Sequence, residues 1–236
     1  MIPILLIAGN FVRENRWPVL LLLTWLLLSA LAFGVLEDHP ALADILFYLK
    51  QQTFYGIAFS GFLSAAAIHN ERKSRRILGV LSKGITRGQY VAGLLLGVFT
   101  GAAGYCAAIG GAGSWIARKG GLQLDQLWWV VALVMAACVV AATMAMFFST
   151  FLNPFLATAA AAFLIGGPIM AGMYSSAGWL RLMPVYALAE SLLRFSFQRD
   201  WEPGWSYVGI AALHAIGFWL ASTLVFGRRD IAVAVE

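Results

Sequence analysis

Charged residues are scarce in this sequence. Only 11% of its 236 residues are Asp, Glu, Lys or Arg, whereas a soluble globular domain contains about 25%. The hydrophobic fraction is 61%. A membrane-spanning helix needs about 20 apolar residues, so six crossings would use about half of the chain. The composition therefore predicts an all-α integral membrane protein with one domain over residues 1–236 and loops too short for a soluble catalytic domain.

Cysteine and histidine are also few, with two and three residues. Cys106 and Cys138 lie in apolar stretches, where a thiol is most simply a small buried side chain. The sequence has no Cys and His set with zinc spacing, no HExxH, and no GxxxxGK[ST] loop for ATP. Serines in the apolar runs have no apparent paired base, and the near absence of carboxylates there disfavours an acidic proton relay. We therefore expect no catalytic residue, metal or cofactor in this chain.

Six apolar runs predict membrane-spanning helices. They cover residues 17–36, 48–69, 90–115, 127–148, 155–173 and 205–226. Lys50, Gln51 and Gln52 interrupt the outer end of the second run. Either they face a wet cavity, which we favour, or they mark a helix that starts later. Gly166, Gly167 and Pro168 predict a kink or break in the fifth run, because proline removes a backbone donor.

Small and polar residues within the runs indicate packing or function. Gly93, Gly97 and Gly101 repeat the GxxxG spacing, which lets another helix approach closely, most simply within one subunit. Ser60 lies on a similar small-residue face of the second run. His214 lies near the middle of the sixth run, where an ionisable group is a functional candidate, although a neutral histidine bonded within the bundle is the simpler interpretation. The candidate pathway residues are Gln51, Gln52, Ser60 and His214.

Two shorter segments are amphipathic. Residues 4–16 place Ile4, Ala8 and Phe11 at helical spacing and predict a helix lying in the membrane interface. Residues 185–197 place Leu188, Leu192 and Phe195 on one face and predict a short helix between the fifth and sixth runs.

The stretch from Asn70 to Tyr90 is the only long polar segment between apolar runs. It carries six basic residues and one acid, Glu71. Ile77, Leu78, Val80 and Leu81 have helical spacing, and Gly84 and Gly88 then favour a turn. The segment is either an ordinary positively charged loop or a docking site for a soluble partner on the cytoplasmic side.

This segment resembles a motif of ABC transporter permeases of the type 2 exporter class. Glu71 matches the family's acid, Val80-Leu81-Ser82 its Leu-Leu-Ser, and Ile85-Thr86-Arg87 its hydrophobic-Ser-Arg. The sequence departs from the family at Arg75 and Arg76, where Gly-Thr is frequent, and at Gly84, where proline is frequent. The six-run layout extends the resemblance over the whole chain.

The resemblance implies an elbow helix over residues 4–16, a cytoplasmic coupling segment over residues 70–88, and short outer gate helices between the fifth and sixth spans. It implies a second copy of the chain or a related permease as a partner, together with ABC ATPase subunits that bind ATP and Mg. The second and fifth spans would line the route. The residues expected to couple to the ATPase are Glu71, Arg72, Arg75, Arg76, Leu81, Ser82 and Arg87.

Lysine and arginine predict the orientation. With the N-terminus inside, ten basic residues are cytoplasmic and six are outside, which favours a multi-pass protein of the inner (plasma) membrane with both termini in the cytoplasm. The net charge of +5 reflects this topology and does not indicate nucleic acid as a partner. Two other functions stay open: a secondary carrier or channel without a nucleotidase, and a small polytopic membrane enzyme.

Overall fold

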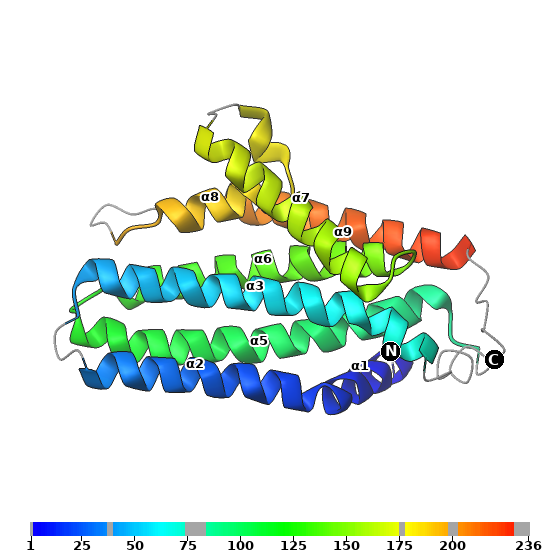
Figure 1. Ribbon diagram of the computed structural model, residues 1–236, viewed down its shortest axis with the longest axis horizontal. Helices are drawn as coiled ribbons and strands as arrows, with labels where there is room; N and C mark the ends of the chain where they lie inside the picture. The colour runs from blue at the N-terminus through cyan, green and yellow to red at the C-terminus, as the bar shows by residue number, and fades with distance from the viewer. Residues whose placement is uncertain (1, 37–39, 74–83, 175–177, 198–202, 229–236) are drawn as a thin grey trace.

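The computed structural model describes residues 2–36, 40–73, 84–174, 178–197 and 203–228, and all of their regular structure is helical (Figure 1). The α-helices, with one 3₁₀ helix (η1), are α1 (Ile2–Glu14), α2 (Arg16–Leu36), α3 (Leu42–Lys73), α5 (Arg87–Lys119), α6 (Leu124–Ser149), α7 (Pro154–Tyr174), η1 (Gly178–Leu182), α8 (Tyr186–Arg194) and α9 (Trp205–Arg228).

Five of these helices are long and apolar enough to cross a membrane, namely α2, α5, α6, α7 and α9. The chain is therefore a helical, multi-pass membrane protein. The remaining long helix, α3, has 32 residues, but polar side chains such as Lys50, Gln51 and Gln52 lower its hydropathy.

Helix α6 forms the centre of the bundle. Val134, Ala137, Cys138 and Ala141 on α6 are fully buried, and α3, α5, α7 and α9 all pack against this helix. Its small side chains allow this close approach. The N-terminus and the end of α9 lie at the same end of the bundle, on the right in Figure 1.

Helix α1 packs against the GxxxG face of α5. A Cβ atom on Gly93 would lie 2.8 Å from Ile7, and one on Gly97 would lie 2.7 Å from Phe11, so both glycines are needed for this contact. A Cβ atom on Gly101 would meet Val19 of α2 at 3.6 Å. Within the described residues, the GxxxG repeat therefore serves packing inside one chain.

The structure excludes one of the alternatives that the sequence left open in each of two helices. Helix α3 begins at Leu42, before the Lys50-Gln51-Gln52 cluster, so the cluster does not mark a later start. Helix α7 continues through Pro168 to Tyr174, so the predicted break is absent. A membrane helix tolerates proline because the neighbouring turns adjust to the missing hydrogen bond, and leaving the helix would expose more backbone polar groups.

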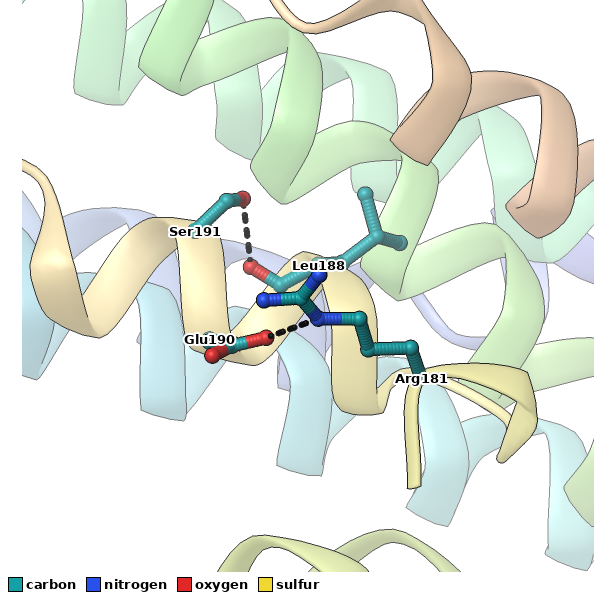
Figure 2. A network of polar contacts seen from close by, with 4 residues as sticks. All are labelled: Arg181, Leu188, Glu190 and Ser191. Carbon is teal, nitrogen blue, oxygen red and sulfur yellow. Dashed lines mark hydrogen bonds and ion pairs between the residues drawn. The ribbon is translucent and has the colours of Figure 1, made fainter. Parts of the chain in front are cut away.

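The predicted amphipathic helix between the last two spans is confirmed as α8. The side chains of Leu188 and Leu192, on one face of α8, are buried. Figure 2 shows Arg181 of η1 reaching Glu190 of α8, with a distance of 3.3 Å between Nε and Oε2. The Ser191 hydroxyl donates to the Leu188 carbonyl at 2.8 Å. The ion pair links η1 to α8, so the two short elements form one unit.

Candidate functional site

The last turn of α3 and the first turns of α5 lie together, which brings the two ends of the polar stretch Asn70–Tyr90 into contact. The Tyr90 hydroxyl donates a hydrogen bond of 2.6 Å to Glu71 Oε2. Tyr90 itself is 1% exposed and belongs to a core cluster with Ile68, Leu94 and Phe226. The acid of the segment is therefore held by a residue that is fixed in the bundle.

Arg87 attaches the same region to the last helix. Its Nη1 donates to the carbonyls of Phe226 and Gly227, both at 2.9 Å, at the C-terminal end of α9. The last carbonyls of a helix lack partners within it and carry partial negative charge, so a guanidinium is a favourable cap.

Helix α5 begins at Arg87 because of a capping box. The Thr86 hydroxyl accepts from the Gln89 backbone N–H at 3.2 Å, and the Gln89 side chain accepts from the Thr86 backbone N–H at 3.1 Å. This arrangement satisfies two donors of the first turn. The N-cap Thr86 thus fixes the start of α5 at Arg87, the residue that caps α9.

The side chains of most of the expected coupling residues lie outside the residues that the structure describes. Four of them, Arg75, Arg76, Leu81 and Ser82, fall in the range 74–83, outside the described residues, as do the helically spaced Ile77, Leu78 and Val80. Arg72 belongs to the last turn of α3, and its side chain is likewise outside the description. Of the seven residues, the structure thus places the side chains of Glu71 and Arg87, which lie at the same end of the bundle.

A groove of about 420 Å³ lies between α3, α7 and α8. Helix α3 contributes Phe54, Ile57 and Gly61, and α7 contributes Ala161 and Ile165, among others. It is open toward the surroundings of the bundle because Phe54, Met170 and Leu193 along it are 54–69% exposed. An apolar groove of this size with a few polar groups is typical of a small-molecule site.

Lys50 forms one end of the groove. Its Nζ donates to the carbonyl of Leu193, in the last turn of α8, at 2.7 Å. The lysine thus caps α8 as Arg87 caps α9, and it also presents a positive charge to the groove.

The start of α8 at the groove is strained. Val185, which lines the groove, has φ 66° and ψ −22°. A β-branched residue in the left-handed region costs about 1–3 kcal/mol and persists only where the surroundings hold it. Burial of Val185 and the 2.8 Å hydrogen bond from the Ala189 N–H to its carbonyl hold it here. Strain of this kind is concentrated at functional sites.

Gln52 belongs to a buried polar network on the other side of α3. Its Nε2 donates to Ser29 Oγ of α2 at 3.2 Å, and the Tyr105 hydroxyl of α5 lies 3.0 Å from its Oε1 and 2.9 Å from its carbonyl. Gln51 is exposed and donates to the Tyr55 hydroxyl at 3.0 Å. These adjacent glutamines therefore have different environments, and neither lines the groove.

Ser60 is buried on the same helix, against the thiol of Cys138, which also contacts the thiol of Cys106. His214 lies apart from these residues on α9, which packs mainly on α6. Its Nδ1 is buried and has no hydrogen-bond partner among the described residues. The structure thus brings Gln52 and Ser60 to one face of α3 and leaves His214 elsewhere, and the pathway role of all four stays a prediction.

Sequence reasoning assigned no role to Tyr90 or to the carbonyls at the end of α9, and it grouped Lys50 with Gln51 and Gln52 without indicating the groove or the contact with α8. A helical stripe on α3, with Thr53, Phe54, Ile57 and Gly61 at spacings of one, three and four residues, was the available signal for the groove. The partners of Lys50 and Arg87 are 143 and 139 or more residues away in the sequence, so no local pattern indicates them.

The sequence matches no protein-family model, and a comparison with curated proteins also found no match.

Proposed function

We propose that this chain is the membrane-spanning permease subunit of an ATP-driven ABC exporter of the type 2 class. It would carry a lipid, an amphipathic molecule or a drug, powered by separate ATPase subunits that bind ATP and Mg. The observation that carries the proposal is the attachment of the basic segment at both ends. Glu71 is bonded to Tyr90 at its start, and Arg87 is bonded to the end of α9 at its finish.

A six-span topology is the arrangement that fits this function. Helix α3 would be the sixth crossing, since 32 residues at 1.5 Å each give about 48 Å, more than the roughly 30 Å hydrocarbon core. The burial and hydrogen bonds of Gln52 lower the cost of placing its polar groups there. An even number of crossings agrees with the start of α1 and the end of α9 lying at one end of the bundle (Figure 1). The excess of basic residues puts that end in the cytoplasm, beneath the inner membrane.

A second permease chain would complete the pathway. Helices α2 and α7 present large apolar side chains outward, including Leu21 at 74% and Phe163 at 75% exposed. Lipid can also cover such apolar faces. The faces of α2 and α7 therefore support an interface with a second permease chain only in combination with the family resemblance. We assign the permease contact to α2 and α7, with the groove between α3 and α7 forming part of the route.

The mechanism follows from the two attachments. Closure of the ATPase subunits would push on residues 70–88 from below. Because Glu71 of α3 is bonded to Tyr90 of α5 and Arg87 to the end of α9, a displacement of either end of the segment would be passed to those helices. The displacement would then open or close the groove, of which α3 forms one wall.

Reconstitution with the ATPase tests this coupling. We expect Glu71→Lys to lower transport about tenfold while ATP hydrolysis continues, because a lysine cannot accept the Tyr90 hydrogen bond. Tyr90→Phe should show a weaker version of the same defect. It removes the hydrogen bond, which contributes about 1.5–3 kcal/mol because its acceptor is charged, but it leaves the charge of Glu71 unchanged. Arg118→Gln, an exposed change near the other end of α5 and outside residues 70–88, is the control.

Two results would count against the proposal. One is normal transport and normal stimulated hydrolysis in a chain carrying Glu71→Lys, Arg75→Glu and Arg76→Glu together. The other is a chain that purifies in mild detergent as a monomer with no P-loop ATPase, which would favour a carrier, a channel or a membrane enzyme instead.

A further inference from the structure

The groove between α3, α7 and α8 has the length of one membrane leaflet. Its lining positions on α3 run from Lys50 to Gly61. These eleven steps correspond to about 16 Å at 1.5 Å per residue, which is roughly half of a 30 Å hydrocarbon core. Its volume of about 420 Å³ is near the lower end of ligand sites, which span roughly 300–1,000 Å³. The space fits one alkyl chain better than two.

Between its ends, the groove is lined by side chains that leave almost no polar group available to a ligand. Thr53 and Thr158 are the hydroxyl-bearing residues of its lining. Their hydroxyls already donate to carbonyls of their own helices, Leu49 and Pro154, each at 2.8 Å. A ligand lying along the groove therefore gains mainly from burying apolar surface.

The end of the groove is different. Lys50 is the only charged residue among the described lining residues. One of its three N–H groups donates to the Leu193 carbonyl, and the ammonium can direct the others to a ligand. The acid of α8, Glu190, is already paired with Arg181 (Figure 2). The charge at the groove end is thus positive and complementary to an anion.

We infer that the groove binds an anionic membrane lipid, with one alkyl chain along α3 and α7 and the headgroup against Lys50. This inference deepens the proposed function. Only the idea that the bound lipid is the transported substrate rests on that function, whereas binding itself does not. Lateral entry fits the exposure of Phe54 and Met170, because the groove is open along its side.

Binding is measured on the chain alone in phosphatidylcholine nanodiscs, without an ATPase. Radiolabelled dodecyl phosphate is titrated below its micellar concentration. Dodecylphosphocholine has the same chain with a zwitterionic headgroup, and inorganic phosphate has no chain. We expect saturable binding of dodecyl phosphate, binding of dodecylphosphocholine at least about tenfold weaker, and no binding of phosphate.

Three variants assign the site. Gly61→Leu should abolish saturable binding, because a Cβ atom on Gly61 meets nothing within 4 Å and the side chain would extend into the groove. Lys50→Gln should weaken dodecyl phosphate about tenfold and leave dodecylphosphocholine unchanged. Lys50→Arg, which keeps the charge and a donor for α8, should restore binding and thereby separate the charge effect from loosening of α8. Lys73→Gln, the same change at the other end of α3, should have no effect.

The inference is wrong if wild-type chain shows no saturable binding, if both headgroups bind equally, or if Gly61→Leu binds normally. None of these results bears on whether an ATPase co-purifies. Conversely, saturable, Lys50-dependent binding by a chain that associates with no ATPase would leave the lipid site standing and remove the proposed function.

Discussion

The neighbouring residues Gln51 and Gln52 of α3 differ in burial and in hydrogen bonding. Gln51 is exposed, whereas Gln52 is 1% exposed and joins α2, α3 and α5 through Ser29 and Tyr105. A buried amide at membrane depth is costly unless it is bonded, because lipid offers no replacement partner.

Substitution of the two glutamines tests this difference. Gln52→Ala should lower the free energy of unfolding by about 1–3 kcal/mol, because it removes hydrogen bonds and leaves a void. Gln51→Ala should change it by less than about 0.5 kcal/mol. Reversible unfolding in mixed micelles measures both. Equal effects of the two changes would remove the structural role of Gln52.

The sequence indicated that Lys50, Gln51 and Gln52 need polar surroundings, but not which surroundings. Periodicity places residues on a helix face, whereas the partner of each face depends on how distant helices pack. Gln52 is hydrogen-bonded to α2 and α5, and Lys50 donates one hydrogen bond to the end of α8. Neither contact could be predicted without the tertiary arrangement.

At the scale of helices, basic side chains cap the C-terminal ends of other helices. Lys119 donates to the Gly34 carbonyl of α2 at 2.6 Å, Lys50 to Leu193 of α8, and Arg87 to Phe226 and Gly227 of α9. Each pairs a cation with the negative end of a helix dipole. These basic residues therefore fix helix ends as well as contributing to topology.

The Arg87 cap predicts local fraying of α9. Arg87→Ala should destabilise the protein by about 1–2 kcal/mol and speed amide exchange in the last turn of α9, because its carbonyls lose a charged donor. Arg87→Lys should retain part of the effect. Arg118→Ala on the same helix, where the residue is exposed, is the control and should leave exchange in α9 unchanged.

The packing of α1 on α5 predicts a contrast between two glycines. Gly97→Leu should destabilise by about 1–3 kcal/mol, because it must displace Phe11. Gly104→Ala, on the same helix with nothing within 4 Å, should be neutral or slightly stabilising. Thermal denaturation measures both changes, and a stable Gly97→Leu chain would contradict the tight α1–α5 contact.

The apolar runs predicted the positions of the long helices because burial in lipid imposes length and composition. The fifth run was harder, since Pro168 breaks most soluble helices but lies within α7. Backbone hydrogen bonding inside a membrane outweighs the local preference of proline.

At the scale of the whole molecule, Lys73 and Asp125 lie at opposite ends of the bundle, at the end of α3 and the start of α6 (Figure 1). In a chain with Cys106 and Cys138 replaced by alanine, Asp125→Cys should react with an impermeant thiol reagent on intact cells. Lys73→Cys should react only after the membrane is opened. Labelling of Lys73→Cys in intact cells would reverse the proposed orientation.

The long-range caps have a consequence for biosynthesis. Arg87 emerges from the ribosome at least 139 residues before its acceptor carbonyls on α9. At roughly 5–20 residues per second this interval lasts about 7–28 s. During that time the guanidinium lacks these two acceptor carbonyls. The nascent protein therefore acquires this contact only after Phe226 and Gly227 have been synthesised, so a chain that terminates before Phe226 lacks the carbonyls through which Arg87 joins α5 to α9.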